Sequence, residues 1–192
     1  MKLKYIPNIL SVFRICLVGL FAYVFFACED GLILAAGIFI FSGLTDVLDG
    51  KLARHFNWVT QFGKILDPLA DKLMQCTALF CLAFKGYAPW WIFVFFVTKE
   101  LLMCIGAIVF FRKNHEIGVS KYFGKAAVVL FYGAVVSIIL FGDKLGTLGV
   151  NILCVLTAIC ALCALVMYYF NYLKSKKSKE SIPDETGGEA KI

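Results

Sequence analysis

Charged residues are scarce in this sequence. They make up 17% of its 192 residues, whereas 61% are hydrophobic. An ordinary soluble domain is about one quarter charged and about half apolar. The surplus apolar residues lie in long blocks, and a membrane-spanning helix needs a block of about 20. The composition therefore argues against a soluble domain and favours one compact membrane domain.

The sequence also lacks the clusters that a zinc site requires. Cys160 and Cys163 form a C-x-x-C pair, but neither a second pair nor a histidine cluster accompanies it. Nearly all of the eight cysteines lie in apolar runs, so we interpret them as small buried hydrophobic residues. The first apolar block has no convincing signal-peptide cleavage site, and we interpret it as a true span. No internal repeat stands out, and no stretch is suited to binding nucleic acid.

Six blocks are candidates for spanning helices, separated by glycine, proline and polar residues. They cover residues 9–28, 32–52, 66–86, 89–111, 122–141 and 147–172. A short mixed segment, residues 2–6, precedes them and could lie in the membrane interface. We therefore predict an all-α integral membrane protein with six transmembrane helices and a short N-terminal interfacial segment.

Lysine and arginine are distributed unevenly between the two ends of these blocks. Apart from Lys85 and Lys144, the basic residues flanking the predicted spans fall on one side. The positive-inside rule then places both termini, and the loops after spans two and four, on the cytoplasmic side of the cell membrane. We assign residues 1–173 to one membrane domain that contains the six predicted helices. Residues 174–192 form a polar tail that we expect to be disordered; its lysines either contact anionic headgroups or simply aid solubility.

Four aspartates gather within 26 residues, where charges are costly inside membrane helices and usually functional. They are Asp46, Asp49, Asp67 and Asp71. The first two share one helical face with Gly50, Ala53 and Arg54, and the last two share another with Gly63. The segment between the two faces is long enough for a turn. Two helix ends can therefore bring all four carboxylates together near the cytoplasmic surface.

Four like charges at one point repel unless a cation lies among them. Carboxylate oxygens suit Mg²⁺ or Mn²⁺, and two such ions can serve phosphoryl chemistry. Gly50 and Gly63 would allow a ligand close to the backbone, and Arg54 could bind a phosphate. Two structural alternatives stay open: Asp67 could cap a helix that starts at Pro68, and Asp46 and Asp49 could form ion pairs with Lys51 or Arg54.

These residues follow the pattern D-x2-D-G-x2-A-R-x8-G-x3-D-x3-D, which resembles the CDP-alcohol phosphotransferase family. The resemblance implies that Asp46, Asp49 and Asp67 ligate two metal ions and that Asp71 adjoins them. It also makes Asp71 the general base that deprotonates the acceptor hydroxyl. The residues expected to contact the CDP part of the donor are Gly50, Arg54, Thr60 and Gly63.

The opening segment from Ile6 to Ser11, followed by Arg14, resembles the start of phosphatidylglycerophosphate synthases and cardiolipin synthases in that family. The resemblance implies that Asn8 and Ser11 help to hold the nucleotide; helix capping by either residue is the alternative. Because family members are typically homodimers, it also implies a homodimer.

The segment from Gly63 to Lys72 resembles synthases that use glycerol 3-phosphate. Cations for that acceptor lie on the expected side of the membrane; they are Lys64, Arg112, Lys121 and Lys125. Ordinary positive-inside flanking is the alternative interpretation of Lys121 and Lys125. Lys99 and Glu100, within an apolar block, form either a neutralising pair or a polar wall of the active cavity. We therefore predict transfer of a phosphatidyl group from CDP-diacylglycerol to glycerol 3-phosphate.

Two alternatives remain. Lys99 stands where the glycerophosphate synthases commonly have arginine, and Ala126 stands where they commonly have threonine. A cardiolipin synthase that takes phosphatidylglycerol is therefore the nearest alternative. A divalent-metal transporter, from a different class, would place its aspartates at mid-bilayer, whereas here they lie at helix ends beside Arg54 and Lys64.

Overall fold

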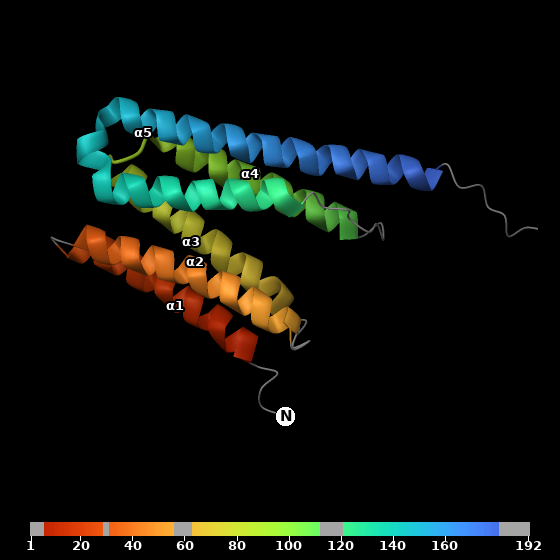
Figure 1. Cartoon of the computed structure of the whole chain (residues 1–192), viewed down its shortest axis with the longest axis horizontal. Coiled ribbons are helices and arrows are strands. Elements are labelled where there is room, and N and C mark those ends of the chain that lie inside the picture. The colour runs from red at the N-terminus through yellow and green to blue at the C-terminus, as the bar shows by residue number, and fades with distance from the viewer. Residues whose placement is uncertain (1–5, 29–30, 56–62, 112–120, 181–192) are drawn as a thin grey trace, which may run out of the picture.

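The computed structural model describes residues 6–28, 31–55, 63–111 and 121–180, and over these residues it is all-helical. Five helices follow one another along the chain (Figure 1): α1 Ile6–Ala27, α2 Gly31–His55, α3 Gly63–Phe84, α4 Trp90–Phe111 and α5 Lys121–Glu180. The first four coincide closely with the first four predicted blocks. The predicted interfacial segment lies outside the described residues, apart from Ile6, which begins α1.

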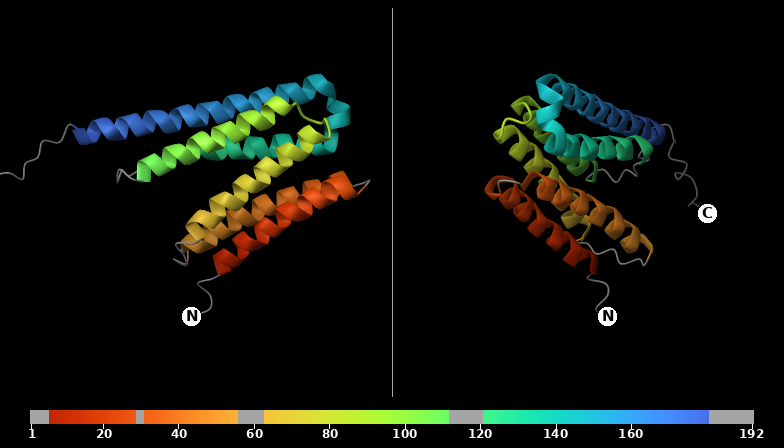
Figure 2. Two further views of the ribbon diagram at one scale, coloured as in Figure 1. Left: turned by 180° about the vertical axis from the view of Figure 1, so that it is seen from behind. Right: turned by 60° about the vertical axis from the view of Figure 1, so that its left-hand side comes forward.

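Helix α5 contains both of the last two predicted blocks. Gly146 interrupts it with φ 62° and ψ 176°, a conformation that is almost exclusive to glycine because a β-carbon would clash there. The chain reverses direction at this point, so that α5 is a helical hairpin with two long arms (Figures 1 and 2). Gly146 thus separates the fifth and sixth predicted blocks, which form the two arms of α5.

Three stretches of the described residues are long and apolar enough to cross a membrane. They are Leu10–Ala27, Gly31–Leu48 and Ala126–Met167. The third has 42 residues, about twice the ~20 that one crossing needs, and the turn at Gly146 divides it. The chain therefore has the helices of a multi-pass membrane protein.

The C-terminal arm of α5 differs from the prediction in one respect. Its helical backbone continues to Glu180, so residues 174–180 are helical, although the predicted disordered tail begins at residue 174. Extending an existing helix avoids the cost of nucleation, and lysine and glutamate are good helix formers. The remainder of that tail, residues 181–192, lies outside the described residues.

The helices pack in two groups. Helix α1 lies against α2 and α3, while α5 lies against α4 and α2, and α3 contacts α4 (Figures 1 and 2). Aromatic rings fill the centre of the bundle: Phe21 and Phe39 are fully buried, and their ring centroids are 5.9 Å apart. Phe39 also stacks on Tyr132 of α5 at 4.5 Å. This stack joins α2 to the first arm of α5.

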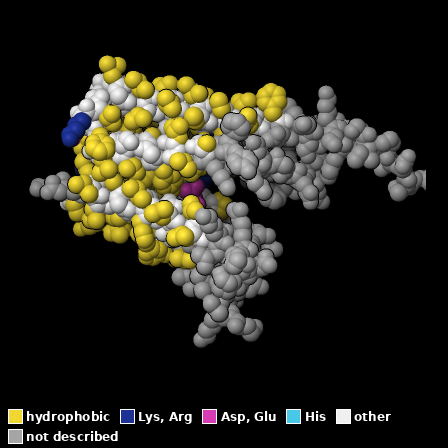
Figure 3. Space-filling model, viewed as in Figure 1, with side chains coloured by type: hydrophobic (Ala, Val, Ile, Leu, Met, Phe, Trp, Pro, Cys, Tyr) yellow, Lys and Arg dark blue, Asp and Glu magenta, His cyan; other side chains and the backbone are white. Residues whose placement is uncertain are grey.

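The outer surface is apolar and the interior holds polar groups. Large hydrophobic side chains cover the described face in Figure 3; Ile33 and Leu148 are 76% and 79% exposed. Ser11, Arg14 and Ser42 are by contrast almost fully buried. A water-soluble protein rarely exposes so much contiguous apolar surface, so this distribution fits a lipid environment.

The cysteines only partly match the interpretation that they are buried hydrophobic residues. Cys81 and Cys154 are buried, whereas other thiols lie at the surface: Cys16, Cys28, Cys104 and Cys163. All eight are free thiols. In a membrane protein, an apolar side chain on the outer surface can face lipid rather than water, so a cysteine need not be buried in the bundle to leave water.

Candidate active site

The aspartate motif extends from the end of α2 to the beginning of α3. The backbone positions of Asp46, Asp49 and Arg54 lie in α2, and those of Asp67 and Asp71 lie in α3. Because α3 already begins at Gly63, Asp67 lies inside the helix and does not cap its start. The helical placement of the motif is therefore as the sequence predicts.

A cavity of about 440 Å³ lies between α2, α3 and α5. Its lining is mostly apolar, and its polar residues are Asp46, Asp71 and Tyr132. Figure 3 shows acidic side chains in a hollow between the two groups of helices. The structure thus brings together one aspartate from each half of the motif, at one cavity that α5 also lines.

Asp46 is held by a buried arginine. Arg14 of α1 donates from Nη1 to Oδ1 of Asp46 at 2.6 Å. The Arg14 side chain is 1% exposed, whereas that of Asp46 is 41% exposed. Arg14 therefore contacts the carboxylate from inside the bundle, although its sequence position also fits a cytoplasmic flanking charge. Ser11, one turn earlier, is also fully buried, and lies too far inside α1 to cap it.

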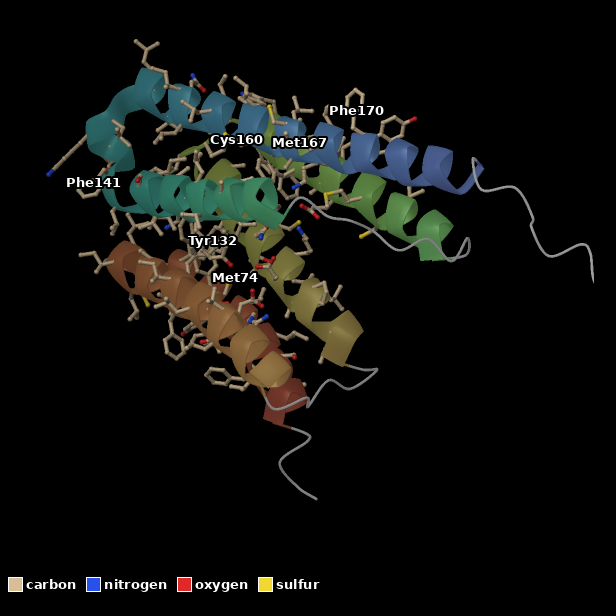
Figure 4. All side chains as sticks on the ribbon, turned by 45° about the vertical axis from the view of Figure 1, so that its right-hand side comes forward. Met74, Tyr132, Phe141, Cys160, Met167 and Phe170 are labelled. Carbon is tan, nitrogen blue, oxygen red and sulfur yellow. The ribbon has the colours of Figure 1, made fainter. Side chains whose placement is uncertain are left out.

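Asp71 accepts two hydrogen bonds, one on each oxygen. Gln75, one turn later on α3, donates from Nε2 to Oδ2 at 2.9 Å. Tyr132 donates its hydroxyl to Oδ1 at 3.1 Å; in Figure 4 it lies between α5 and the group formed by α1, α2 and α3. Sequence reasoning missed both residues. The i, i+4 spacing of Asp71 and Gln75 could have indicated the first, but Tyr132 is 61 residues away.

A second charged cluster links α3 to α4. Glu100 forms ion pairs with Lys72 at 2.7 Å and with Lys99 at 2.6 Å, and the Lys99 ammonium lies 5.1 Å from the centroid of the Phe96 ring. Lys99 and Glu100 thus form the neutralising pair that was one of the two predicted possibilities. None of the three charged residues lines the 440 Å³ cavity.

Several predicted site residues cannot be placed by their side chains. Thr60 and Arg112 lie outside the described residues. For the other predicted residues the structure describes the helical backbone but not the side chain: Asn8, Asp49, Gly50, Arg54, Gly63, Lys64, Asp67, Lys121 and Lys125. Among the side chains that are described, no group of three or more potential metal ligands occurs. Asp46 and Asp71 nevertheless supply carboxylate oxygens, the donor type that Mg²⁺ and Mn²⁺ prefer.

Known proteins similar to this chain include a cardiolipin synthase (CMP-forming) of Streptomyces coelicolor, 32% identical over 126 residues, which are 64% of this chain and 59% of that protein. A CDP-diacylglycerol–glycerol-3-phosphate 3-phosphatidyltransferase of Bacillus subtilis is 36% identical over 108 residues, 50% of this chain and 56% of that protein. One with the same name from Pectobacterium atrosepticum is 42% identical over 88 residues, 45% of this chain and 48% of that protein. The chain thus spans about half to three fifths of the length of these relatives.

The family comparison extends over much more of the chain. Residues 4–170 match the CDP-alcohol phosphatidyltransferase family, and this range includes the whole aspartate motif, α1 to α4 and most of α5. The match is consistent with the geometry of the site, in which Asp46 and Asp71 face one cavity. The chain belongs to the CDP-alcohol phosphatidyltransferase family.

Proposed function

We propose that the chain is an integral membrane enzyme that transfers a phosphatidyl group from CDP-diacylglycerol to glycerol 3-phosphate, releasing CMP. The observation that carries this proposal is the meeting of Asp46 and Asp71 at one cavity, in a member of the CDP-alcohol phosphatidyltransferase family. Relatives named for the glycerol 3-phosphate reaction support this acceptor.

Asp46 and Asp49 on α2 and Asp67 on α3 would hold two Mg²⁺ or Mn²⁺ ions, with Asp71 of α3 adjoining them. When bound, these ions would neutralise the diphosphate and stabilise the leaving CMP. Arg14 would fix the orientation of Asp46 through the 2.6 Å contact. The Arg14 side chain is buried, so water does not compete for its guanidinium group.

The donor would be held by the residues at the start of α1 and around the motif. These are Asn8, Ser11, Gly50, Arg54, Thr60 and Gly63. Arg54 would bind the diphosphate through charge-assisted hydrogen bonds. The acyl chains of the donor can stay in the lipid phase, since the outer surfaces of the helices are apolar.

The chemical step needs a base, because an alcohol is a weak nucleophile near neutral pH. Asp71 would accept the proton of the acceptor hydroxyl. The acceptor oxygen then forms a bond to the phosphorus that carries diacylglycerol, and the bond from that phosphorus to the CMP oxygen breaks. The acceptor phosphate would be bound by the cations Lys64, Arg112, Lys121 and Lys125.

The proposed topology has six membrane crossings: four from α1 to α4 and two from the arms of α5. Both termini and the active site would face the cytoplasm, as the distribution of lysine and arginine indicates. The protein would act as a homodimer in the cell membrane. The catalytic domain would comprise residues 1–173.

Cardiolipin synthesis is the second candidate function. The relative from Streptomyces coelicolor carries that name, and the cavity beside Asp46 and Asp71 is lined mainly by apolar residues, which suits a lipid acceptor as well as a lipid donor. The two functions differ only in the acceptor, so the identity of the lipid product separates them.

The test is to incubate the purified protein with CDP-diacylglycerol, Mg²⁺ or Mn²⁺ and a panel of acceptors. We expect CMP and phosphatidylglycerophosphate with glycerol 3-phosphate. Cardiolipin from phosphatidylglycerol, without phosphatidylglycerophosphate, would replace the first function by the second. Absence of CMP release with every acceptor, together with metal uptake into liposomes, would favour a transporter instead.

A further inference from the structure

Tyr132 of α5 lies outside the aspartate motif but donates a hydrogen bond to Asp71. We propose that Tyr132 is a positioning residue, which orients the carboxylate of Asp71 for proton transfer from the acceptor. This inference rests on the proposed function, in which Asp71 is the base. It assigns a part of the reaction to α5, a helix that contributes none of the motif aspartates.

The first argument is the geometry around Asp71. Its two oxygens accept from different helices: Oδ2 from Gln75 of α3 at 2.9 Å, and Oδ1 from Tyr132 of α5 at 3.1 Å. A carboxylate bound on both oxygens cannot rotate freely about its terminal bond. Each oxygen still has a further lone pair, so the two contacts leave capacity for a proton. Tyr132 and Gln75 therefore fix the orientation without occupying the whole carboxylate.

The second argument is that the ring of Tyr132 is itself held in place. Phe39 of α2 stacks on it with centroids 4.5 Å apart and an interplanar angle of 25°. The backbone of Gly43, one turn later on α2, lies against its edge. A β-carbon at Gly43 would be 2.6 Å from Cε1 and 3.2 Å from Cζ of Tyr132, and Cζ carries the hydroxyl. The absence of a side chain at Gly43 thus allows the hydroxyl to reach Asp71.

The third argument is the hydroxyl itself. Packing between Phe39 and Gly43 needs only an aromatic ring, and phenylalanine would supply one. Placing a hydroxyl in a largely apolar cavity wall is unfavourable unless it forms a hydrogen bond. Here it donates to a carboxylate, and hydrogen bonds to charged groups are the stronger kind. The position therefore favours tyrosine for its contact with Asp71.

The test uses steady-state kinetics with CDP-diacylglycerol and the best acceptor from the panel. Tyr132→Phe removes only the hydroxyl, and we expect kcat to fall roughly tenfold to a hundredfold, the scale of one hydrogen bond to a charged group. The KM for CDP-diacylglycerol should stay within about twofold, because Tyr132 is not among the residues proposed to bind the CDP part of the donor. Gly43→Ala should also lower kcat, since the new methyl group displaces the ring.

If both substitutions act through the same hydrogen bond, their effects will not add: the double variant should be no slower than the slower single variant. Gly37→Ala, on the same helix, is the matched control, because a β-carbon there meets nothing within 4 Å. Tyr87→Phe controls for loss of a tyrosine hydroxyl at another cavity. Unchanged kcat in Tyr132→Phe, or additive effects in the double variant, would overturn the inference.

A second readout does not depend on activity. Thermal unfolding in detergent with EDTA is measured for Tyr132→Phe, Asp71→Ala and the double variant. We expect the Tm shifts to be coupled, with Tyr132→Phe costing less once Asp71 is gone; additive shifts would show that the hydrogen bond is absent. Coupled shifts with unchanged kcat would overturn the positioning role alone. A wild-type protein that releases no CMP would overturn the proposed function, and the positioning role with it.

Discussion

Removing Asp46 should destabilise the protein more than removing Arg14, although the two form one ion pair. The reason is their unequal burial: the Arg14 side chain is 1% exposed and that of Asp46 is 41% exposed. Asp46→Ala leaves a buried guanidinium without the carboxylate at 2.6 Å. Arg14→Met leaves a carboxylate that water can reach, and methionine fills much of the space of the arginine stem.

The magnitudes follow from this asymmetry. Removing one partner of a buried ion pair costs about 3–5 kcal/mol, and the exposure of Asp46 places Asp46→Ala at the lower end, about 3 kcal/mol. Arg14→Met loses a hydrogen bond to a charged group, which contributes about 1.5 kcal/mol or more, but it also removes the cost of burying the guanidinium. We expect a net loss of about 1 kcal/mol. For a chain of this length, Tm should fall by roughly 6–12 °C and 2–4 °C, respectively.

The assay is thermal unfolding of the purified protein in detergent, with EDTA present so that loss of bound metal does not contribute. Asp143→Ala is the control: Asp143 is an exposed aspartate away from the Asp46 cavity, and its replacement should change stability by less than about 0.5 kcal/mol. A larger loss of Tm in Arg14→Met than in Asp46→Ala would refute the reasoning from burial.

Four further predictions follow. Asp71→Asn should lower kcat by roughly a hundredfold or more, without recovery at high Mg²⁺, whereas Asp46→Asn should recover part of its activity in the same titration; equal recovery would make Asp71 a ligand rather than the base. Arg54→Ala should raise the KM for CDP-diacylglycerol about tenfold to a hundredfold, and an unchanged KM and kcat would remove it from the site. A cysteine replacing Asn57 in a cysteine-free background should react with reagents added on the cytoplasmic side; reaction from the external side alone would contradict the topology. Gly146→Ala should lower the stability by about 1–3 kcal/mol, measured as Tm, and an unchanged Tm would show that the turn tolerates a side chain.

The sequence predicted the helices and the motif well because both depend on local patterns. Apolar blocks set the helix positions, and fixed spacing places Asp46 and Asp71 near facing helix ends. The environment of each carboxylate was harder to predict from the sequence. Arg14 occupies a position that also suits a cytoplasmic flanking charge, and no local pattern distinguishes an arginine that faces a bundle from one that faces headgroups. Its burial depends on the packing of α1 against α2.

Tyr132 shows a second limit. In the sequence it is an aromatic residue in an apolar block, the usual composition of a lipid-facing or core position. Its contact with Asp71 spans 61 residues and depends on how α5 lies against α2. Gly43 could have been read only as a small residue, since the ring that needs the space comes from the distant helix. Such pairs emerge from helix packing rather than from spacing along one helix.

The length of the second arm of α5 has a consequence at the membrane surface. From Gly146 to Glu180 the helix rises roughly 50 Å at about 1.5 Å per residue, whereas the hydrocarbon core is only about 30 Å thick. If the turn lies at the outer interface, roughly the last 20 Å stands beyond the hydrocarbon. In Figure 1 the end of α5 projects past the other helices. The lysine-rich stretch from Lys174 to Lys179 is then part of a rigid helix that extends from the membrane. Its distance from the headgroups is set by the length of the helix, not by the reach of a random chain.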